Sequence, residues 1–249
     1  MLKNFSNPHR SRSKAIETYA QSIETLSGLR GDLSALNEHA QFSFHSDVEP
    51  IYRDLVSLLL EVASDQIDST SPDAMVVSEP AQQALLQAQG VIESLRLAEL
   101  DNYFKEACID VQPVNINQVD ADAAILYTIV LPDRLAVILH LPSQYFSTTV
   151  TSGEVAQVSR QLRQELVIRS QRRYEPLAQK LYHWIVEPME DAIAISDVET
   201  LVFVLDGPLQ NVPMAALHNG SHFLVEDYAI ALTPGISLLS PQPLQSRDL

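Results

Sequence analysis

The single cysteine is the first residue to consider, because a thiolate can act as a nucleophile in peptidases. Such a thiolate needs a lowered pKa and a base within hydrogen-bond reach, commonly a histidine. Cys108 follows Lys105 and Glu106 at the end of a helix with one apolar face. No sequence cue places a histidine beside it. We therefore interpret Cys108 as a packed structural thiol and expect no catalytic residue in this chain.

Histidines are the next candidates, because imidazole binds metals and carries protons. Two groups carry atoms that metals accept: His39 and His45 with Asp47 and Glu49, and His218 with His222. Zinc sites usually show tighter paired spacing than either group. The dipeptide Asn219-Gly220, between His218 and His222, favours a type I′ reversal, which explains the second group without a metal. We interpret these histidines as surface residues and expect no metal and no other cofactor.

An aspartate directly after a buried strand is the third candidate. Asp206 follows the apolar residues 201–205 and begins the sequence Asp206-Gly207-Pro208. Catalytic groups of α/β enzymes gather at the carboxyl ends of strands, so Asp206 could be catalytic. Asp-Gly also makes turns, in which Gly207 takes a positive φ and Asp206 bonds its own backbone. We favour the turn, and no nucleotide-binding or hydrolase motif accompanies it.

Helices are predicted for the first part of the chain. Residues 1–12 are polar and basic and indicate a loose leader. Apolar residues at three- and four-residue steps then predict helices over 13–37, 47–63 and 81–107. Asp47 is placed to cap the second of these, with Pro50 in its first turn. Residues 64–80 are rich in Ser, Asp, Thr and Pro and predict an exposed connector.

Extended structure begins after Pro113. Two nearly continuous apolar runs, 123–131 and 135–141, predict an antiparallel hairpin that turns at Pro132-Asp133 and is covered on both faces. Residues 144–151 are more polar and predict an edge strand. Further helices are predicted over 152–170 and 174–193, the second bent or restarted at Pro188. Further strands are predicted over 201–205 and 223–232.

The fold class that follows is α/β. We expect a helical region, residues 13–112, followed by a mixed sheet with flanking helices in residues 113–249. A helix barely begins at Ile236, and the last nine residues resemble a linker. We therefore expect the α/β part to be incomplete at its carboxyl end.

The charge balance argues against several classes of partner. Sixteen basic and thirty-two acidic residues give a net charge of −16, which disfavours nucleic acid and anionic membranes. No run of eighteen apolar residues and no signal-peptide core occur, so we expect a cytoplasmic protein. Six bases fall within residues 160–180. We interpret them as a solvated basic face near an acidic neighbour, with a site for an acidic partner as the alternative.

Two segments carry a family resemblance. Residues 201–218 read as an apolar strand followed by Asp-Gly, a leucine, a proline and Ala-Ala-Leu-His, and residues 223–234 contain a Leu-Glu-Tyr pattern before a strand that ends in proline. This pattern resembles the first part of the CHAT domain, a caspase-like module often found behind TPR repeats and abundant in cyanobacteria. A weaker likeness extends back to Phe42.

This resemblance implies a caspase-like fold and, in active members, a cysteine peptidase with a His-Cys dyad. The dyad histidine stands in a His-Gly setting and the cysteine in a Ser-Ala-Cys setting, and neither occurs here. His218 lies in the Ala-Ala-Leu-His position, which is not that of the dyad. The resemblance implies a non-catalytic amino-terminal part that is inactive alone and has a protein partner. The alternative is a freestanding interaction or scaffold module, in which residues 13–107 bind a partner.

Overall fold

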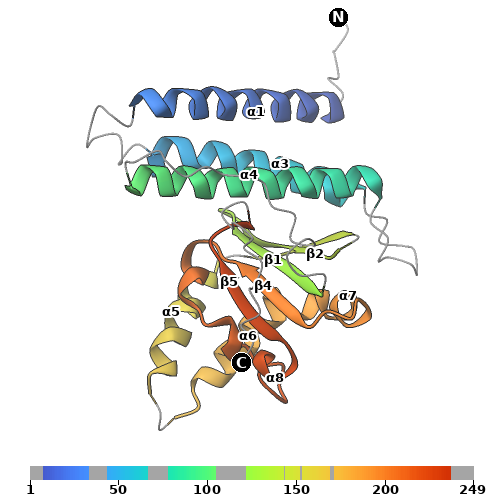
Figure 1. Ribbon diagram of the computed structural model, residues 1–249, viewed down its shortest axis with the longest axis vertical. Helices are drawn as coiled ribbons and strands as arrows, with labels where there is room; N and C mark the ends of the chain where they lie inside the picture. The colour runs from blue at the N-terminus through green and yellow to red at the C-terminus, as the bar shows by residue number, and fades with distance from the viewer. Residues whose placement is uncertain are drawn as a thin grey trace, which may run out of the picture. The chain divides into compact units, whose positions relative to one another are not determined.

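The protein divides into two compact units, residues 1–109 and 110–249 (Figure 1). The computed structural model describes residues 8–33, 44–66, 78–104, 122–142, 144–151, 153–168 and 171–236. Helices form the described part of the first unit. The second unit contains a mixed sheet with helices, so the predicted α/β class is confirmed.

The described part of the first unit is built around one central helix. Its elements are α1 (Pro8–Leu33), the π-helical turn η1 (Phe44–Val48), α3 (Glu49–Asp65) and α4 (Glu79–Phe104). α3 packs against both α1 and α4. Its apolar face is closed to solvent, with Tyr52, Val56 and Ala63 at 0% exposure. The Tyr19 hydroxyl of α1 donates to the carboxylate of Asp54 on α3 at 3.1 Å.

The helix boundaries differ from the predictions at the amino-terminal ends. α1 begins at Pro8, inside the stretch predicted to be a loose leader, because proline suits the first turn, where no N–H is needed. Asp47 lies in a π-helical turn, and α3 begins after it at Glu49. The predicted third helix is confirmed as α4 up to Phe104. Residues 105–107, and the ends predicted at 34–37, lie outside the described residues.

The sheet of the second unit has five strands among the described residues, in the order β3-β2-β1-β4-β5. The strands are β1 (Ala123–Val130), β2 (Arg134–His140), β3 (Tyr145–Thr151), β4 (Thr200–Val204) and β5 (Ala229–Thr233). β2 runs antiparallel to both β1 and β3, whereas β1, β4 and β5 are parallel to one another. The sheet is therefore mixed, as predicted.

The predicted hairpin is confirmed as β1 and β2. The amide of Leu131 donates to the carbonyl of Arg134 at 2.8 Å and closes the turn. Residues 123–129 and 135–139 are all buried, which confirms that both faces of these apolar strands are covered. The predicted edge strand is also confirmed, because β3 pairs with β2 alone among the described strands.

Helices follow the hairpin and lead to β4. They are α5 (Val155–Leu166), α6 (Tyr174–Ile185), the 3-10 turn η3 (Glu187–Met189) and α7 (Glu190–Ile195). α5 and α6 pack against each other, and α5 also contacts the 3-10 turn η4 (Gly207–Asn211) that follows β4. The predicted effect of Pro188 is confirmed, because α6 ends at Ile185 and a fresh helix begins at Glu190.

The segment predicted as a strand over 223–232 is only partly extended, so this prediction is wrong for its first half. A one-turn helix, α8 (Leu224–Asp227), precedes β5. The reason is local: the Glu226 carboxylate accepts the amide of Phe223 at 2.7 Å and starts a helical turn. Among the described residues, no helix is long and apolar enough to cross a membrane.

Candidate functional site

The carboxyl edge of the sheet is the place to look for a site, because β1, β4 and β5 are parallel and end at the same edge. Catalytic and binding groups of α/β folds gather at such edges. Asp206 follows β4 here and Thr233 ends β5. Both are buried, with Asp206 at 1% exposure.

The Asp206 side chain binds the end of β1 rather than facing solvent. Its Oδ2 atom accepts the backbone amide of Val130 at 2.8 Å, and its own amide donates to the hydroxyl of Thr128 at 3.2 Å. β1 runs past the end of β4, since the last residues in register are Tyr127 and Val204. Asp206 therefore continues the pairing of β1 where the neighbouring strand has stopped.

This geometry corrects the predicted local role of Asp206, whose side chain makes no capping hydrogen bond to η4, the turn that it precedes. The predicted positive φ of Gly207 is confirmed at 52°. The backbone of the turn closes through the amide of Leu209, which donates to the Asp206 carbonyl at 3.1 Å. A carboxylate that is buried and bonded to backbone is suited to holding strands in place. The absence of a catalytic role for Asp206 stays a prediction.

The segment from His218 to His222 forms a reversal whose polar groups bond to one another. The Asn219 Oδ1 atom accepts the amides of Ser221 and His222 at 2.8 and 2.9 Å, and His218 Nδ1 accepts the amide of Gly220 at 2.9 Å. The predicted type I′ turn is wrong, because that turn needs a positive φ at both central residues and Gly220 has one but Asn219 does not. The side chain of Asn219 shapes the reversal instead.

The remaining histidine and carboxylate candidates do not converge in the described structure. His222 pairs with Asp227 at 2.5 Å, and Glu49 pairs with Arg53 at 2.6 Å. Within the described ranges, no group of three His, Cys, Asp or Glu side chains could hold a metal ion. Cys108 and His39 lie outside the described residues. His45 lies in η1, but its side chain is not described.

His140 is a half-buried histidine that the sequence interpretation missed. It ends β2, is paired in register with Tyr145 of β3, and stacks on that ring with centroids 4.2 Å apart. Its Nδ1 atom is buried and has no hydrogen-bond partner among the described residues. Burial lowers the pKa of His140 to about 4, so the ring is neutral at pH 7. Its position at the end of an apolar strand is the signal that could have indicated it.

A tyrosine pair near α7 was also missed. Tyr182 of α6 is 6% exposed, and burial raises its pKa well above the ordinary value, with a further increase from the nearby carboxylate of Glu190. Burial likewise raises the pKa of Tyr228, with contributions from Asp227 and Glu190. Both phenols are therefore kept neutral. The break at Pro188 brings Glu190 back towards α6. The three-residue turn η3, which makes this break, is hard to predict from sequence.

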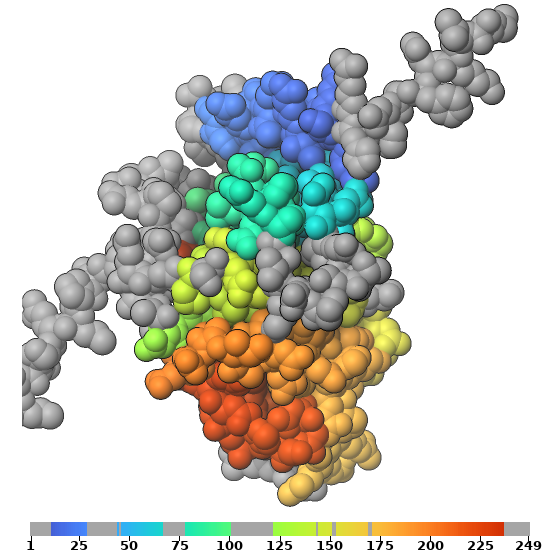
Figure 2. Space-filling view, turned by 90° about the vertical axis from the view of Figure 1, so that its right-hand side faces the viewer, coloured from blue at the N-terminus to red at the C-terminus, as the bar shows by residue number. Residues whose placement is uncertain are grey.

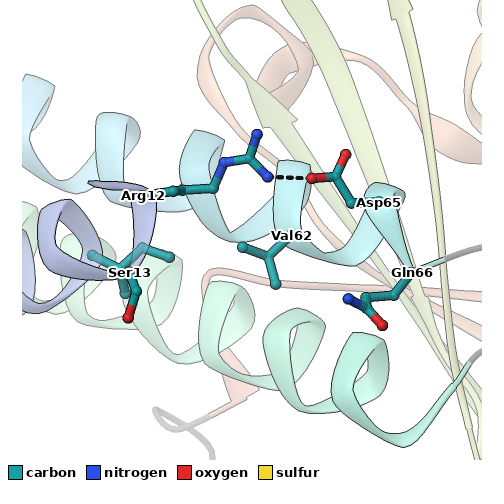
Figure 3. Close-up of a pocket in the computed structure, with 6 residues that line it drawn as sticks. Arg12, Ser13, Val62, Asp65 and Gln66 are labelled. Atoms are coloured by element: carbon teal, nitrogen blue, oxygen red, sulfur yellow. Dashed lines mark hydrogen bonds and ion pairs between the residues drawn. The ribbon is translucent and has the colours of Figure 1, made fainter. Parts of the chain in front are cut away.

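A small pocket lies between α1 and α3 (Figure 3). It encloses about 270 Å³ and is lined by Arg12, Ser13, Ile16, Val62, Asp65 and Gln66. Arg12 is bound by Asp65 and lies 3.6 Å from Glu61, so its positive charge is compensated by two carboxylates. None of the lining residues is a nucleophile paired with a base. We therefore interpret the pocket as a gap in the packing of α1 on α3 rather than as a reaction site.

Comparison with protein families supports the resemblance seen in the sequence. Residues 175–248 match the CHAT domain family. The matched region begins in α6 and includes β4, the Asp206 turn, α8 and β5, whereas the β1–β2 hairpin and the first unit lie outside it. A search of curated proteins found no relative that matches the chain. The suspected resemblance is thus confirmed over residues 175–248, which match the CHAT domain, a family related to caspase-like peptidases.

Proposed function

We propose that this chain is a non-catalytic, amino-terminal part of a CHAT-type caspase-like cysteine peptidase and does not cleave peptides by itself. Its role is to form the first strands of the sheet and their helical support. A His-Cys dyad supplied by another part of the fold, in the same molecule or a second chain, would complete the peptidase. We place the protein in the cytoplasm.

The observation that carries this proposal is the composition of the matched region. Residues 175–248 contain no cysteine, and the single thiol of the chain, Cys108, lies outside them. The histidines of this region are engaged elsewhere: His183 pairs with Glu187, His218 accepts the Gly220 amide, and His222 pairs with Asp227. A cysteine peptidase requires a thiolate beside a base, and this region offers no such pair.

The outer strand of the sheet supports the proposed completion by further strands. β5 pairs with β4 alone among the described strands. Leu232, the fourth of the five residues of β5, is 58% exposed. Unpaired strand edges with exposed apolar side chains favour pairing with another strand. An added strand on β5 would cover both the free backbone groups and Leu232.

The test is a peptidase assay on the purified chain with a panel of fluorogenic peptides, with and without a cysteine alkylating agent. We expect no turnover above buffer. Turnover that is blocked by the alkylating agent and lost in Cys108→Ala would overturn the proposal, because it would show a working thiol in this chain. Turnover that survives Cys108→Ala would point to a contaminant and requires repurification.

A second candidate function, a freestanding interaction module, is favoured by the surface of α1. The described side chains of this helix, residues 11–28, include none that is buried, and its apolar residues Ile16, Ile23 and Leu26 remain partly exposed. Ile16 lines the pocket beside α3, so only the part of this stripe that α3 leaves uncovered could bind a helix of a partner. Sedimentation and chemical unfolding discriminate the two functions. A monodisperse monomer with one cooperative transition favours the module, and association through the β5 edge favours the incomplete sheet.

A further inference from the structure

The hairpin of α5 and α6 carries a concentration of positive charge that is unlike the rest of the chain. Residues 160–180 hold six bases and two acids, whereas the other residues hold ten bases and thirty acids. Four of these bases, Arg160, Arg163, Arg172 and Arg173, are exposed, and we call them the hairpin arginines. The first two lie on α5, and the other two directly precede α6.

The hairpin arginines lie close to the end where the two helices are joined. α5 and α6 run side by side, and part of this hairpin is visible at the surface in yellow to light orange (Figure 2). The amide of Gln171 donates to the carbonyl of Ile168 at 3.4 Å and links the two arms. Arg160 and Arg163 are three residues apart and so share one face of α5.

Within the described part of the chain these cations lack acidic partners, which is unusual for a protein with twice as many acids as bases. Among the described residues, no carboxylate lies within ion-pair distance of any hairpin arginine. Other cations whose side chains are described are paired with acids: Arg12, Arg53, Arg96, Arg134 and Lys180. Lys14 is the exception in the first unit. The positive charge of the hairpin is thus left available to another molecule.

Exposed apolar side chains lie beside the hairpin arginines. Val167 is 77% exposed and Ile168 is 42% exposed, at the carboxyl end of α5. Val167 follows Arg163 by four residues, about one helical turn, and aliphatic side chains next to cations favour a partner that presents acidic groups around an apolar contact. Burial of the apolar residues contributes affinity, while the charges contribute orientation and association rate.

The net charge of the whole chain favours an acidic protein segment over other polyanions as the partner. Nucleic acids and anionic membranes present continuous negative charge, which the net charge of −16 repels. Base stacking needs exposed aromatic rings. The aromatic residue next to the hairpin arginines, Tyr174, stacks on Phe223 at 6.3 Å between centroids. A short acidic peptide carries fewer negative charges, so it meets the local positive charge with less repulsion from the rest of the chain, and it needs no aromatic platform.

We infer that the hairpin arginines, together with Val167 and Ile168, form a docking surface for an acidic, partly apolar segment of a partner protein. This surface is independent of the proposed role as part of a peptidase. A site for an acidic partner is the alternative interpretation of the bases in residues 160–180, and the end of the α5–α6 hairpin is the place where such a site would lie.

The test measures binding of a fluorescent peptide of alternating Glu and Leu by anisotropy. We expect saturable binding that weakens as salt rises from about 50 to about 200 mM, because ion pairs are screened. Arg163→Glu should weaken binding by about tenfold, since it replaces an attraction by a repulsion within contact distance. Arg163→Lys should retain most of the binding, and Val167→Ser should weaken it at every salt concentration.

The matched control is Lys14→Glu, which also replaces an exposed, unpaired cation and changes the net charge by the same amount. It should leave binding nearly unchanged. An equal loss in Lys14→Glu and Arg163→Glu would overturn the proposal, because binding would then follow net charge alone. Absence of peptide binding, or tighter binding to phosphatidylserine vesicles or duplex DNA than to the peptide, would overturn it as well.

Discussion

The carboxylate of Asp206 and the backbone amide of Val130 lie 2.8 Å apart and join two strands at the carboxyl edge of the sheet. The two residues are far apart in sequence, one after β4 and the other at the end of β1. A buried amide without an acceptor costs free energy comparable to a lost hydrogen bond. Asp206 therefore stabilises the register between β1 and β4, which is the parallel pair at the centre of the sheet.

Replacing Asp206 by alanine should destabilise the second unit. The substitution removes the acceptor of a buried amide, so we expect the free energy of unfolding to fall by about 1–3 kcal/mol. Asp206→Asn keeps an acceptor oxygen and should cost less. Urea unfolding followed by circular dichroism measures both. Asp191→Ala, at an exposed site, is the control and should change little. A loss for Asp206→Ala no larger than this control would contradict the structural role.

Gly207→Ala should destabilise the turn through its backbone. Gly207 has a φ of 52°, and a left-handed conformation costs an L-residue roughly 1–2 kcal/mol. A Cβ there would lie 3.9 Å from Val130 Cγ2, an ordinary contact, so the cost is conformational rather than steric. Gly207→Asn should recover part of the loss, since asparagine tolerates this region. The control is Gly153→Ala, where a Cβ meets nothing within 4 Å. Equal melting temperatures for Gly207→Ala and Gly153→Ala would refute the prediction.

Protonation of His140 should destabilise the fold in acid. Burial lowers its pKa from 6.5 to about 4, so between these values the unfolded chain binds more protons than the folded one. The contribution of neutral His140 to the free energy of unfolding is fully present above pH 6.5 and is lost as the pH drops towards 4. We expect a loss on the order of 1 kcal/mol, allowing for solvent screening of a partly exposed ring.

The matched variant for this effect is His140→Phe, which keeps an aromatic ring against Tyr145 but cannot titrate. It should lose less stability than the wild type between pH 6.5 and 4, although acidic side chains titrate equally in both. Urea unfolding at a series of pH values gives the difference. Parallel stability curves for the two proteins would show that His140 does not titrate in this way.

Ionisation of Tyr182 should lower the stability of the fold at alkaline pH. Burial and the Glu190 carboxylate raise its pKa above 10, so the folded chain keeps a proton that the unfolded chain loses. Stability therefore decreases as the pH rises above 10. In Tyr182→Phe this decrease should be smaller, and spectrophotometric titration should lose its most alkaline phenol transition. Glu190→Gln should lower the pKa of Tyr182 without removing that transition. An unchanged titration curve in Tyr182→Phe would contradict the assignment.

Local sequence patterns were sufficient to predict most elements of the fold. The apolar runs of β1 and β2, the turn between them and the restart of the helix at Pro188 all follow from residues adjacent in sequence. The same holds for the positive φ of Gly207, which has no Cβ to oppose it. In contrast, the strand prediction over 223–232 failed at α8, because a single bond from Glu226 outweighed the β propensity of an apolar run.

The sequence by itself determined the α/β class, the turn at Asp206-Gly207, the family resemblance and the concentration of arginine within residues 160–180. Only the tertiary structure decided which groups meet. The acceptor role of Asp206 depends on β4 lying parallel beside β1, and the partial burial of His140 depends on the pairing of β2 with β3. Among the described residues, the hairpin arginines lack acidic partners because of where the acids lie in space. Hydrogen bonds, burial and ion pairs between distant residues arise from packing, which no local pattern encodes.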